Sequence, residues 1–310
     1  MQVGPASQNV PAGSGLERVA VVILTYNQRD MTLRCLGSLQ EEEDQPFDIL
    51  VWDNGSADGT AEAVAAAFPG VLLHESADNL GVAGGRNAAA RLAFEKLDPN
   101  YLLFLDNDMV VEPGFVKALL APLRADDRVG QTQAKLRFVN DPERLNDGGG
   151  CDISFILGRT RPVGFGEIDR GQYDQRRECV ACGGAMMVRA ELFQRLGGFD
   201  TIFNPFGPED LDFSLRLAGA GYQALFVPDA VAYHEVSHTF GANYDAVYAR
   251  LKMRHWLLFM KRHAPRWKVA VFFTLTAPWL FVRTVSREAM RGNFSVLPGL
   301  VKGIFDFRRG

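Results

Sequence analysis

The chain has 310 residues, of which 47% are hydrophobic, 23% charged and 11% aromatic. This composition excludes a globally disordered chain, and the length allows one large domain with an appendage or two modest domains. Its four cysteines are too few and too scattered for a disulfide framework, and the Cys179–Cys182 pair has no further zinc ligands at suitable spacing. We therefore expect reduced thiols and a cytoplasmic protein.

The net charge of −4 is unevenly distributed along the chain. From Arg250 onward, thirteen basic residues face only Glu288 and Asp306, so this segment carries +11 and the preceding part carries −15. Such an asymmetry indicates an anionic surface as the partner of the C-terminal end.

The first part of the chain begins with a tail and continues with alternating strands and helices. Residues 1–17 are rich in Gly, Pro and Ser, without apolar periodicity or the order of a signal peptide, so we predict a disordered tail. The expected strands are 18–24, 47–52, 71–74 and 101–105, and the expected helices are 30–39 (with Asp30 as N-cap), 57–68 and 86–97. This alternation predicts parallel βαβ units with functional loops at the carboxyl ends of the strands.

After Gly114 the pattern becomes mixed, which predicts additional strands on a mainly parallel sheet. The expected strands are 129–139, 180–188, 224–227 and 230–233, the expected helices are 190–196 and 211–220, and residues 140–175 form a Gly-rich, poorly defined stretch. Beyond Ser237 the chain is basic, aromatic and helical. We therefore expect an α/β fold, with a Rossmann-like sheet flanked by helices and a helical C-terminal extension.

Polar residues follow three of the expected strands, in Thr25-Tyr26-Asn27, Asp53-Asn54 and Asp106-Asn107-Asp108. This placement predicts one crevice lined by three loops. Asp106 and Asp108 can converge on a divalent cation that neutralises phosphates, although such a motif alone often only caps a turn. The Asp53 loop can equally be a turn that leads into a helix cap.

The loop Asn79–Asn87 precedes an expected helix and has neither the spacing of a dinucleotide fingerprint nor that of a P-loop. Arg86, at the expected helix start, can contact a phosphate or a base, or pair with a surface carboxylate.

The ordered set of motifs resembles family-2 inverting glycosyltransferases of the GT-A fold, in particular a bacterial rhamnosyltransferase-like branch. The resemblance covers about Arg18 to His238. It is carried by Ile23-Leu24-Thr25-Tyr26-Asn27, Asp53-Asn54-Gly55-Ser56, Asn79-Leu80-Gly81, Asp106-Asn107-Asp108, Gly197-Gly198-Phe199-Asp200 and Glu209-Asp210-Leu211-Asp212.

The resemblance implies roles for individual residues. Thr25 and Asp53 would lie at the nucleotide, with Asp53 bonded to the base, while Asp106 would hold the ribose or a metal-bound water. Asp108 would ligate Mg²⁺ or Mn²⁺ on the diphosphate, and Asn107 stands where some relatives have a third aspartate, which leaves the metal ligation open. The remaining residues that it implies at the nucleotide sugar are Tyr26, Asn27, Asn54, Asn79, Gly81, Arg86 and Asn107.

For the chemistry, the resemblance implies Asp210 as the general base and Glu209 as its rival. The alternative is that both carboxylates only cap the following helix, but two exceed what a cap requires. The resemblance also implies that His234 completes the metal site with Asp106 and Asp108 or contacts the diphosphate, and the alternative is a structural histidine.

The C-terminal segment has an apolar stretch, Val269–Val282, of about 14 residues, which is shorter than the roughly 20 that span a bilayer. Pro278 is expected to interrupt a helix there. Flanking cations favour an amphipathic helix on an anionic membrane. The alternatives are a helix packed on the core and an oligomer interface, and no nucleic-acid-binding module accompanies the basic residues.

These expectations give a disordered tail (1–17), a glycosyltransferase domain (18–238) and a C-terminal region at the inner face of the membrane (239–310). The expected reaction is transfer of a sugar from UDP- or dTDP-sugar to an acceptor hydroxyl, for example on a lipid-linked glycan. A sugar-1-phosphate nucleotidyltransferase would need a Gly-rich triphosphate loop that the chain lacks near its first strand. A non-catalytic nucleotide-sugar binder or membrane scaffold would not need the Glu209-Asp210 pair.

Overall fold

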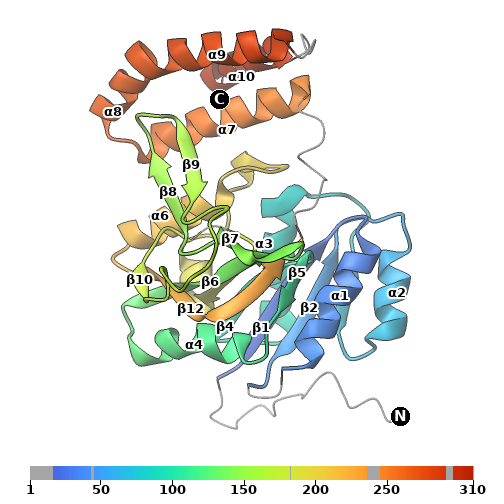
Figure 1. Ribbon diagram of the computed structural model, residues 1–310. Helices are drawn as coiled ribbons and strands as arrows, with labels where there is room; N and C mark the ends of the chain where they lie inside the picture. The colour runs from blue at the N-terminus through green and yellow to red at the C-terminus, as the bar shows by residue number, and fades with distance from the viewer. Residues whose placement is uncertain (1–16, 43–44, 182, 236–244, 291–295, 310) are drawn as a thin grey trace. The chain divides into compact units, whose positions relative to one another are not determined.

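The computed structural model describes residues 17–42, 45–181, 183–235, 245–290 and 296–309 (Figure 1). The expected tail therefore lies outside the described residues except for Glu17. The chain divides into two compact units. The large unit comprises Met1–Cys151 and Pro162–Val236, and the helical unit comprises Asp152–Arg161 and Ser237–Gly310.

The first part of the large unit is a parallel sheet with helices on both faces. Its elements are β1 (Val19–Thr25), α1 (Arg29–Gln40), β2 (Asp48–Asp53), α2 (Thr60–Ala67), β3 (Leu72–Glu75), α3 (Gly81–Lys96) and β4 (Tyr101–Asp106). The four strands are parallel and lie in the order β4-β1-β2-β3. The predicted alternation is confirmed, although Asp30 lies in the first turn of α1 and Gln28 is its N-cap residue.

Near-continuous apolar runs in β1 and β4 reflect burial on both faces of the sheet. In β1, Val21 and Ile23 belong to one core cluster with residues of α1, α2 and α4 (Phe115–Ala125), whereas Ala20 and Val22 belong to a second cluster with residues of α3. Because successive side chains of a strand point to opposite faces, these helices cover the two sides of the sheet.

The second part of the large unit adds strands of both directions beyond β4. Its remaining elements are β5 (Met109–Val111), β6 (Val129–Phe138), β7 (Asp141–Asp147), β10 (Arg177–Glu178), β11 (Ala185–Arg189), α5 (Ala190–Arg195), the 3₁₀ turn η1 (Thr201–Phe203), α6 (Glu209–Gly219) and β12 (Gln223–His234). The sheet continues β4-β11-β6-β12-β10, with β11 antiparallel to both neighbours and β12 parallel to β6. The fold is the expected mixed α/β sheet.

Three expectations for this part are wrong in detail. The strand expected over 180–188 begins at Ala185. The two strands expected over 224–227 and 230–233 form the single strand β12, whose register on β6 shifts between Val227 and Val231. The stretch 140–175 contains β7 and a hairpin, β8 (Cys151–Ser154) and β9 (Arg159–Pro162).

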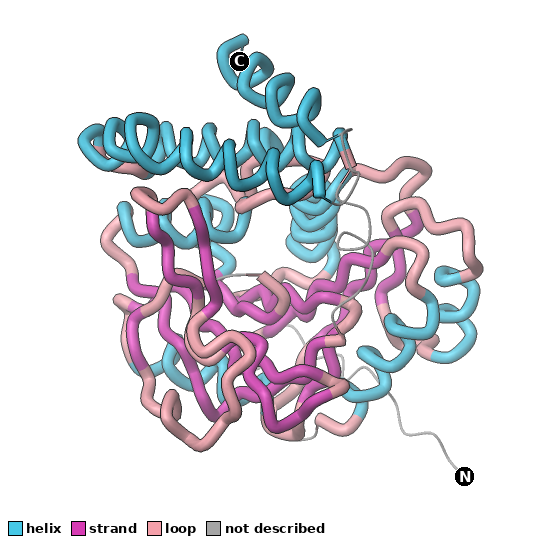
Figure 2. The backbone as a smooth tube through the Cα atoms, turned by 45° about the horizontal axis from the view of Figure 1, so that its top comes forward, coloured by secondary structure: helices cyan, strands magenta, loops and turns pink. Residues whose placement is uncertain are grey.

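The helical unit consists of long helices and the tip of the β8–β9 hairpin. Its helices are α7 (Ala246–His263), α8 (Arg266–Val271), the π-helical turn η2 (Phe272–Thr276), α9 (Ala277–Met290) and α10 (Val296–Arg309), as Figure 2 shows. Helices α7 and α10 approach closely at Gly299, where a Cβ would lie 2.2 Å from the Ala246 carbonyl oxygen. In the hairpin, Phe155 stacks on Trp256 and packs against Phe259 of α7.

Pro278 does not interrupt the helix, in contrast to the prediction. Helices α8 and α9 join through the wide turn η2, so one continuous helix runs from Arg266 to Met290. A π-turn just before a proline makes room for a residue that lacks a backbone N–H.

Candidate functional site

The carboxyl ends of β1, β2 and β4 place three candidate residues along one edge of the sheet. Thr25 pairs in register with Asp53, and Leu24 pairs with Asp106. Parallel strands end at the same edge, so the loops that follow them also lie there. The structure thus brings the three polar segments of the sequence together.

One carboxylate oxygen of Asp53 accepts a hydrogen bond from the described chain, and the other does not. Its Oδ1 accepts a hydrogen bond from the Ser56 backbone N–H at 2.7 Å, and the residue is 2% exposed. Its Oδ2 is buried and accepts no hydrogen bond within the described part of the chain. Buried acceptors are nearly always paired, which indicates that a group outside the chain completes this site.

Thr25 and Asn107 belong to a buried hydrogen-bonded cluster with Thr32 of α1. Thr32 donates to the Gln28 carbonyl, so Thr25 donates to Thr32 at 2.7 Å. Asn107 Nδ2 donates to both hydroxyls, at 3.1 and 3.0 Å. A carboxylate cannot donate these two bonds, which explains an amide at this position. Both side chains hold the loops rather than point into open space.

Three further candidates shape the loops at this edge. Asn27, at a φ of 52°, accepts from the Ala57 N–H and so ties the loop after β1 to the loop after β2. Asn54 donates to Asn79 at 2.9 Å, and Asn79 accepts from the Gly81 N–H at 2.9 Å. The neighbouring Tyr26 is 42% exposed.

Gly81 opens α3 at a place where no side chain fits. Its φ is +72°, and a Cβ there would lie 2.7 Å from Asn204 Oδ1. Asn204 itself donates to the Leu80 carbonyl at 2.8 Å. Sequence reasoning missed Asn204, because nothing local marks a residue that lies more than a hundred positions from its partner.

Arg86 is a buried cation between two carboxylates of the site. It lies in the second turn of α3, not at the helix start, because the helix already begins at Gly81. Its guanidinium contacts Asp106 Oδ1 at 2.5 Å and Glu209 Oε1 at 3.4 Å. Burial lowers the pKa of Arg86, but Asp106, Glu209 and Asp210 outweigh that effect and hold the pKa above its usual range. Among the alternatives that the sequence left open, Arg86 thus pairs with carboxylates, and both of them are candidate residues of the site.

Glu209 and Asp210 are the first two residues of α6, and neither side chain caps it in the usual way, since Pro208 is the N-cap residue. Glu209 is 5% exposed, and Oε2 accepts from the Gly207 N–H at 3.1 Å. Burial and the Asp210 charge raise the pKa of Glu209 to about 8. Burial also raises the pKa of Asp210, against a hydrogen bond from the Gly183 N–H.

His234, at the end of β12, faces Asp108. Its Nε2 lies 3.3 Å from Asp108 Oδ2, while its Nδ1 bonds Asn146 Oδ1 at 3.0 Å. Burial lowers the pKa of His234, but the hydrogen bond and charge of Asp108 outweigh it, so the net shift is upward. Asp108 Oδ1 is buried and, among the described residues, has no hydrogen-bond donor. Sequence reasoning missed Asn146, which lies in the poorly defined stretch.

The Asp108 carboxylate suits Mg²⁺ or Mn²⁺, and the His234 imidazole can join it more readily on Mn²⁺ than on Mg²⁺. The described residues hold no group of three or more such side chains that would bind a metal alone. A cation here would need further oxygen ligands from a bound phosphate.

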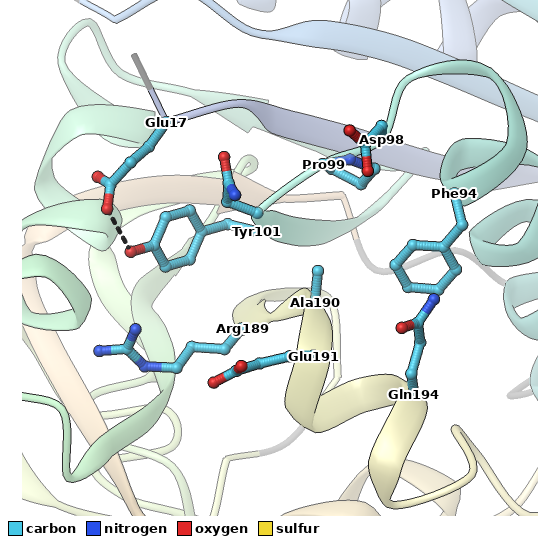
Figure 3. A pocket seen from close by; sticks show the side chains of 10 residues that line it. Glu17, Phe94, Asp98, Pro99, Tyr101, Arg189, Ala190, Glu191 and Gln194 are labelled. Carbon is cyan, nitrogen blue, oxygen red and sulfur yellow. Dashed lines mark hydrogen bonds between the residues drawn. The ribbon is translucent and has the colours of Figure 1, made fainter. Parts of the chain in front are cut away.

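A separate pocket of about 410 Å³ lies at the amino end of β4, opposite the edge that carries Asp106 (Figure 3). Its lining includes Glu17, Tyr101 and Arg189. Arg189 donates to the Val129 carbonyl at 2.9 Å, so it supports the fold. None of the candidate residues lines this pocket.

Comparisons with known proteins identify the family of the chain. A family model described as glycosyl transferase family 2 matches residues 20–197, and one described as the N-terminal domain of galactosyltransferase matches residues 171–252. An N-acetylglucosaminyl-diphospho-decaprenol L-rhamnosyltransferase of Mycobacterium tuberculosis is 25% identical over 300 residues, which are 90% of this chain and 97% of that protein. A validoxylamine A glucosyltransferase of Streptomyces hygroscopicus is 34% identical over 71% of this chain and 53% of its own length.

Solved structures show the same fold. GalNAc-T7 with UDP, GalNAc and Mn²⁺ has a TM-score of 0.64 and 18% identity over 80% of this chain and 48% of its own. The mannosyltransferase PcManGT of Pyrobaculum calidifontis with GDP-Man and Mn²⁺ has a TM-score of 0.55 and 19% identity over 98% of this chain and 91% of its own. The family match over more than half of the chain, on a sheet with this carboxylate-lined edge, shows that the protein belongs to glycosyl transferase family 2 and is a glycosyltransferase with the GT-A fold.

Proposed function

We propose that the enzyme transfers a sugar, with inversion at the anomeric carbon, from a UDP- or dTDP-sugar to an acceptor hydroxyl. The observation that carries the proposal is the pair of buried carboxylate oxygens without donors, Asp53 Oδ2 and Asp108 Oδ1, at one edge of the described sheet. Asp53 Oδ2 can accept the N3–H of uracil or thymine. Asp108 and the adjacent His234 would hold a cation on the diphosphate, which their contact at 3.3 Å supports.

The metal of the proposal is Mg²⁺ or Mn²⁺, and both solved relatives described above contain Mn²⁺. When bound, the cation neutralises charge that grows on the departing diphosphate. Asp106 contributes less directly, because its Oδ1 is held by Arg86. Two protein ligands that are completed by substrate phosphates match the usual way in which Mg²⁺ binds.

Asp210 is the better candidate for the general base. Glu209 pairs with the Arg86 cation through one oxygen and accepts from the Gly207 N–H through the other, and its side chain is 6% exposed. Both oxygens of Asp210 also accept hydrogen bonds, but from the backbone N–H groups of Leu211 and Gly183. Asp210 is more exposed than Glu209, and the Gly183 N–H orients it. In the proposed step the acceptor oxygen bonds to the anomeric carbon, its proton passes to Asp210, and the bond to the donor phosphate oxygen breaks.

For the acceptor, we propose a lipid-linked glycan at the inner face of the membrane. The support is the name of the mycobacterial relative, whose own acceptor is a diphospho-decaprenol glycan, and the basic C-terminal segment of this chain. In this proposal residues 18–238 carry the chemistry and residues 239–310 bring the enzyme to an anionic membrane.

The test is thermal stability of the purified protein with UDP or dTDP, in Mn²⁺ or in EDTA. A ligand that binds only the folded state raises the melting temperature with concentration. We expect metal-dependent stabilisation by at least one nucleotide, lost in Asp108→Ala and kept in the control Asp98→Ala, whose carboxylate is 85% exposed. No shift with any nucleotide and metal would refute the proposal.

A further inference from the structure

The helical unit exposes an apolar helix. From Arg266 to Met290 the chain forms one helix of 25 residues that is long and apolar enough to cross a bilayer, by length and composition alone. Only 6% of its most apolar window is buried. Apolar side chains at this density normally find a partner, so the helix requires a covering surface.

Large apolar side chains are exposed on much of this helix, Phe273 and Phe281 among them at 49% and 46%. Four others share one side. Trp267, Leu275, Trp279 and Val282 are 59%, 70%, 58% and 64% exposed. They are separated by eight, four and three residues, intervals that keep side chains near the same face of a helix. Phe272, by contrast, is 6% exposed and packs at Gly158 of the hairpin, where a Cβ would lie 2.3 Å from its ring. The helix therefore has an inner and an outer face.

Each exposed tryptophan has a cation beside it. Lys268 Nζ lies 5.6 Å from the Trp267 ring centre, and the Arg283 guanidinium lies 5.3 Å from that of Trp279. Indole rings next to basic side chains suit the headgroup level of an anionic bilayer, where the ring enters the acyl boundary and the cation stays with the phosphates.

The charges also decide how the helix lies. The stretch without charge, 269–282, is 14 residues long, which corresponds to about 21 Å of helix and is shorter than the roughly 30 Å of a hydrocarbon core. In a crossing helix centred on this stretch, Arg283 would lie inside the hydrocarbon core and Arg287 near its edge, so the Arg283 side chain would have to snorkel to the headgroups. Lying in the plane of the interface leaves both in contact with headgroups.

We propose that helix 266–290 is an interfacial anchor, which inserts Trp267, Leu275, Trp279 and Val282 into the acyl boundary of an anionic bilayer. This anchor would deepen the proposed function. The biological reason for an anchor rests on the proposed lipid-linked acceptor, whereas membrane binding itself does not depend on it. It differs from simple electrostatic adsorption, since the apolar contribution persists when salt screens the charges.

The test is binding of the full chain to phosphatidylglycerol–phosphatidylcholine vesicles by flotation, at about 0.1 M and 1 M NaCl. We expect binding that weakens but persists at high salt. Trp279→Ala should weaken partition by about tenfold, since a large apolar side chain contributes at least ~1.5 kcal/mol on burial. The matched control is Phe165→Ala, which removes an aromatic of the large unit that is 45% exposed and should leave partition unchanged.

Three results would overturn the proposal. Vesicle binding that is lost at high salt and is unchanged by Trp279→Ala would show adsorption by charge alone. Absence of binding, together with a dimer that Trp279→Ala dissociates, would assign the face to a second copy of the chain. Quenching of Trp279 fluorescence mainly by lipids brominated near the bilayer centre would indicate a crossing helix.

The vesicle test needs no donor, acceptor or metal, so its outcome is independent of the proposed glycosyl transfer. Stabilisation by nucleotide and Mn²⁺ should be the same in Trp279→Ala as in the unaltered chain. Absence of vesicle binding together with intact nucleotide binding would refute only the membrane anchor. Vesicle binding without nucleotide binding would refute only the proposed donor site.

Discussion

Replacing Arg86 with methionine tests whether the buried cation holds the carboxylates of the site together. The substitution keeps much of the side-chain volume but leaves Glu209 and Asp106 without their shared partner. An unpaired charge costs more folding free energy at Glu209, whose side chain is 6% exposed. The Asp106 side chain is 36% exposed, so solvent screens its charge. Removing one member of a buried pair costs about 3–5 kcal/mol, so we expect a loss of that size in the unfolding free energy above about pH 8, where Glu209 is ionised.

The assay is urea denaturation of four proteins, the unaltered chain, Arg86→Met, Glu209→Gln and the double variant, compared at constant m-value. Glu209→Gln should recover stability in the Arg86→Met background, because an amide buries no charge. Arg128→Met is the matched control, since its ion pair with Asp126 is exposed and should contribute little to stability. An Arg86→Met deficit no larger than that of the control, or no recovery in the double variant, would refute the reasoning.

The loss of stability in Arg86→Met should depend on pH, and the direction of this dependence follows from the pKa of Glu209. Burial and the Asp210 charge raise the folded-state pKa of Glu209 from 4.5 to about 8. The folded state then binds more protons than the unfolded state, so this group's contribution is fully present below about pH 4.5 and is lost as the pH rises towards 8. Without Arg86 the upward shift grows, and the Arg86→Met deficit should therefore shrink as the pH is lowered. A deficit that is independent of pH would show that Glu209 is not the group responsible.

Three further predictions concern catalysis and metal binding. Asp210→Asn should lower kcat by about 10²–10⁴-fold with little change in donor affinity, and normal turnover in single-turnover assays would exclude Asp210 as the base. Gly183→Ala should lower kcat more than it changes the donor KM, because the added Cβ would lie 2.8 Å from Asp210 Oδ2. The control Gly37→Ala adds a Cβ with nothing within 4 Å and should leave kcat unchanged. Equal effects of the two substitutions on kcat would exclude a specific role for Gly183. Mn²⁺ affinity, measured by calorimetry with UDP present, should fall as the pH drops below the pKa of His234, which Asp108 raises, because the metal needs the neutral ring. His234→Ala should flatten that dependence, and an unchanged profile would remove His234 from the metal site.

The parts of the fold that sequence reasoning predicted well are those with strong local signals. The apolar runs of β1 and β4 and the polar residues at their ends identify the parallel sheet and its functional edge. The start of α3 was placed five residues too late, because glycines disfavour a helix in isolation. Here they are required, since a Cβ at Gly85 would lie 2.6 Å from Leu24 Cδ1 of β1.

The contacts among the candidate residues could not be predicted from the sequence. Arg86 and Glu209 lie 123 positions apart, and no local pattern indicates that one neutralises the other. The support that Asn146 gives to His234 depends on β7, a strand inside a stretch whose sequence shows no clear period. Such contacts follow from tertiary packing and become visible only when distant segments meet.

The β8–β9 hairpin changes what a truncation of the C-terminal helices would mean. The hairpin tip belongs to the helical unit, while the chain on either side of it belongs to the large unit. The polypeptide therefore passes between the two units three times, after residues 151, 161 and 236, instead of once through a single linker. Deleting the helices would leave Phe155 without Trp256 and Phe259, so a shortened protein would expose an apolar hairpin next to β7 in sequence. The helical unit is thus built from two separate segments of the chain. Exchanging it between relatives would require the hairpin and the helices to be moved together.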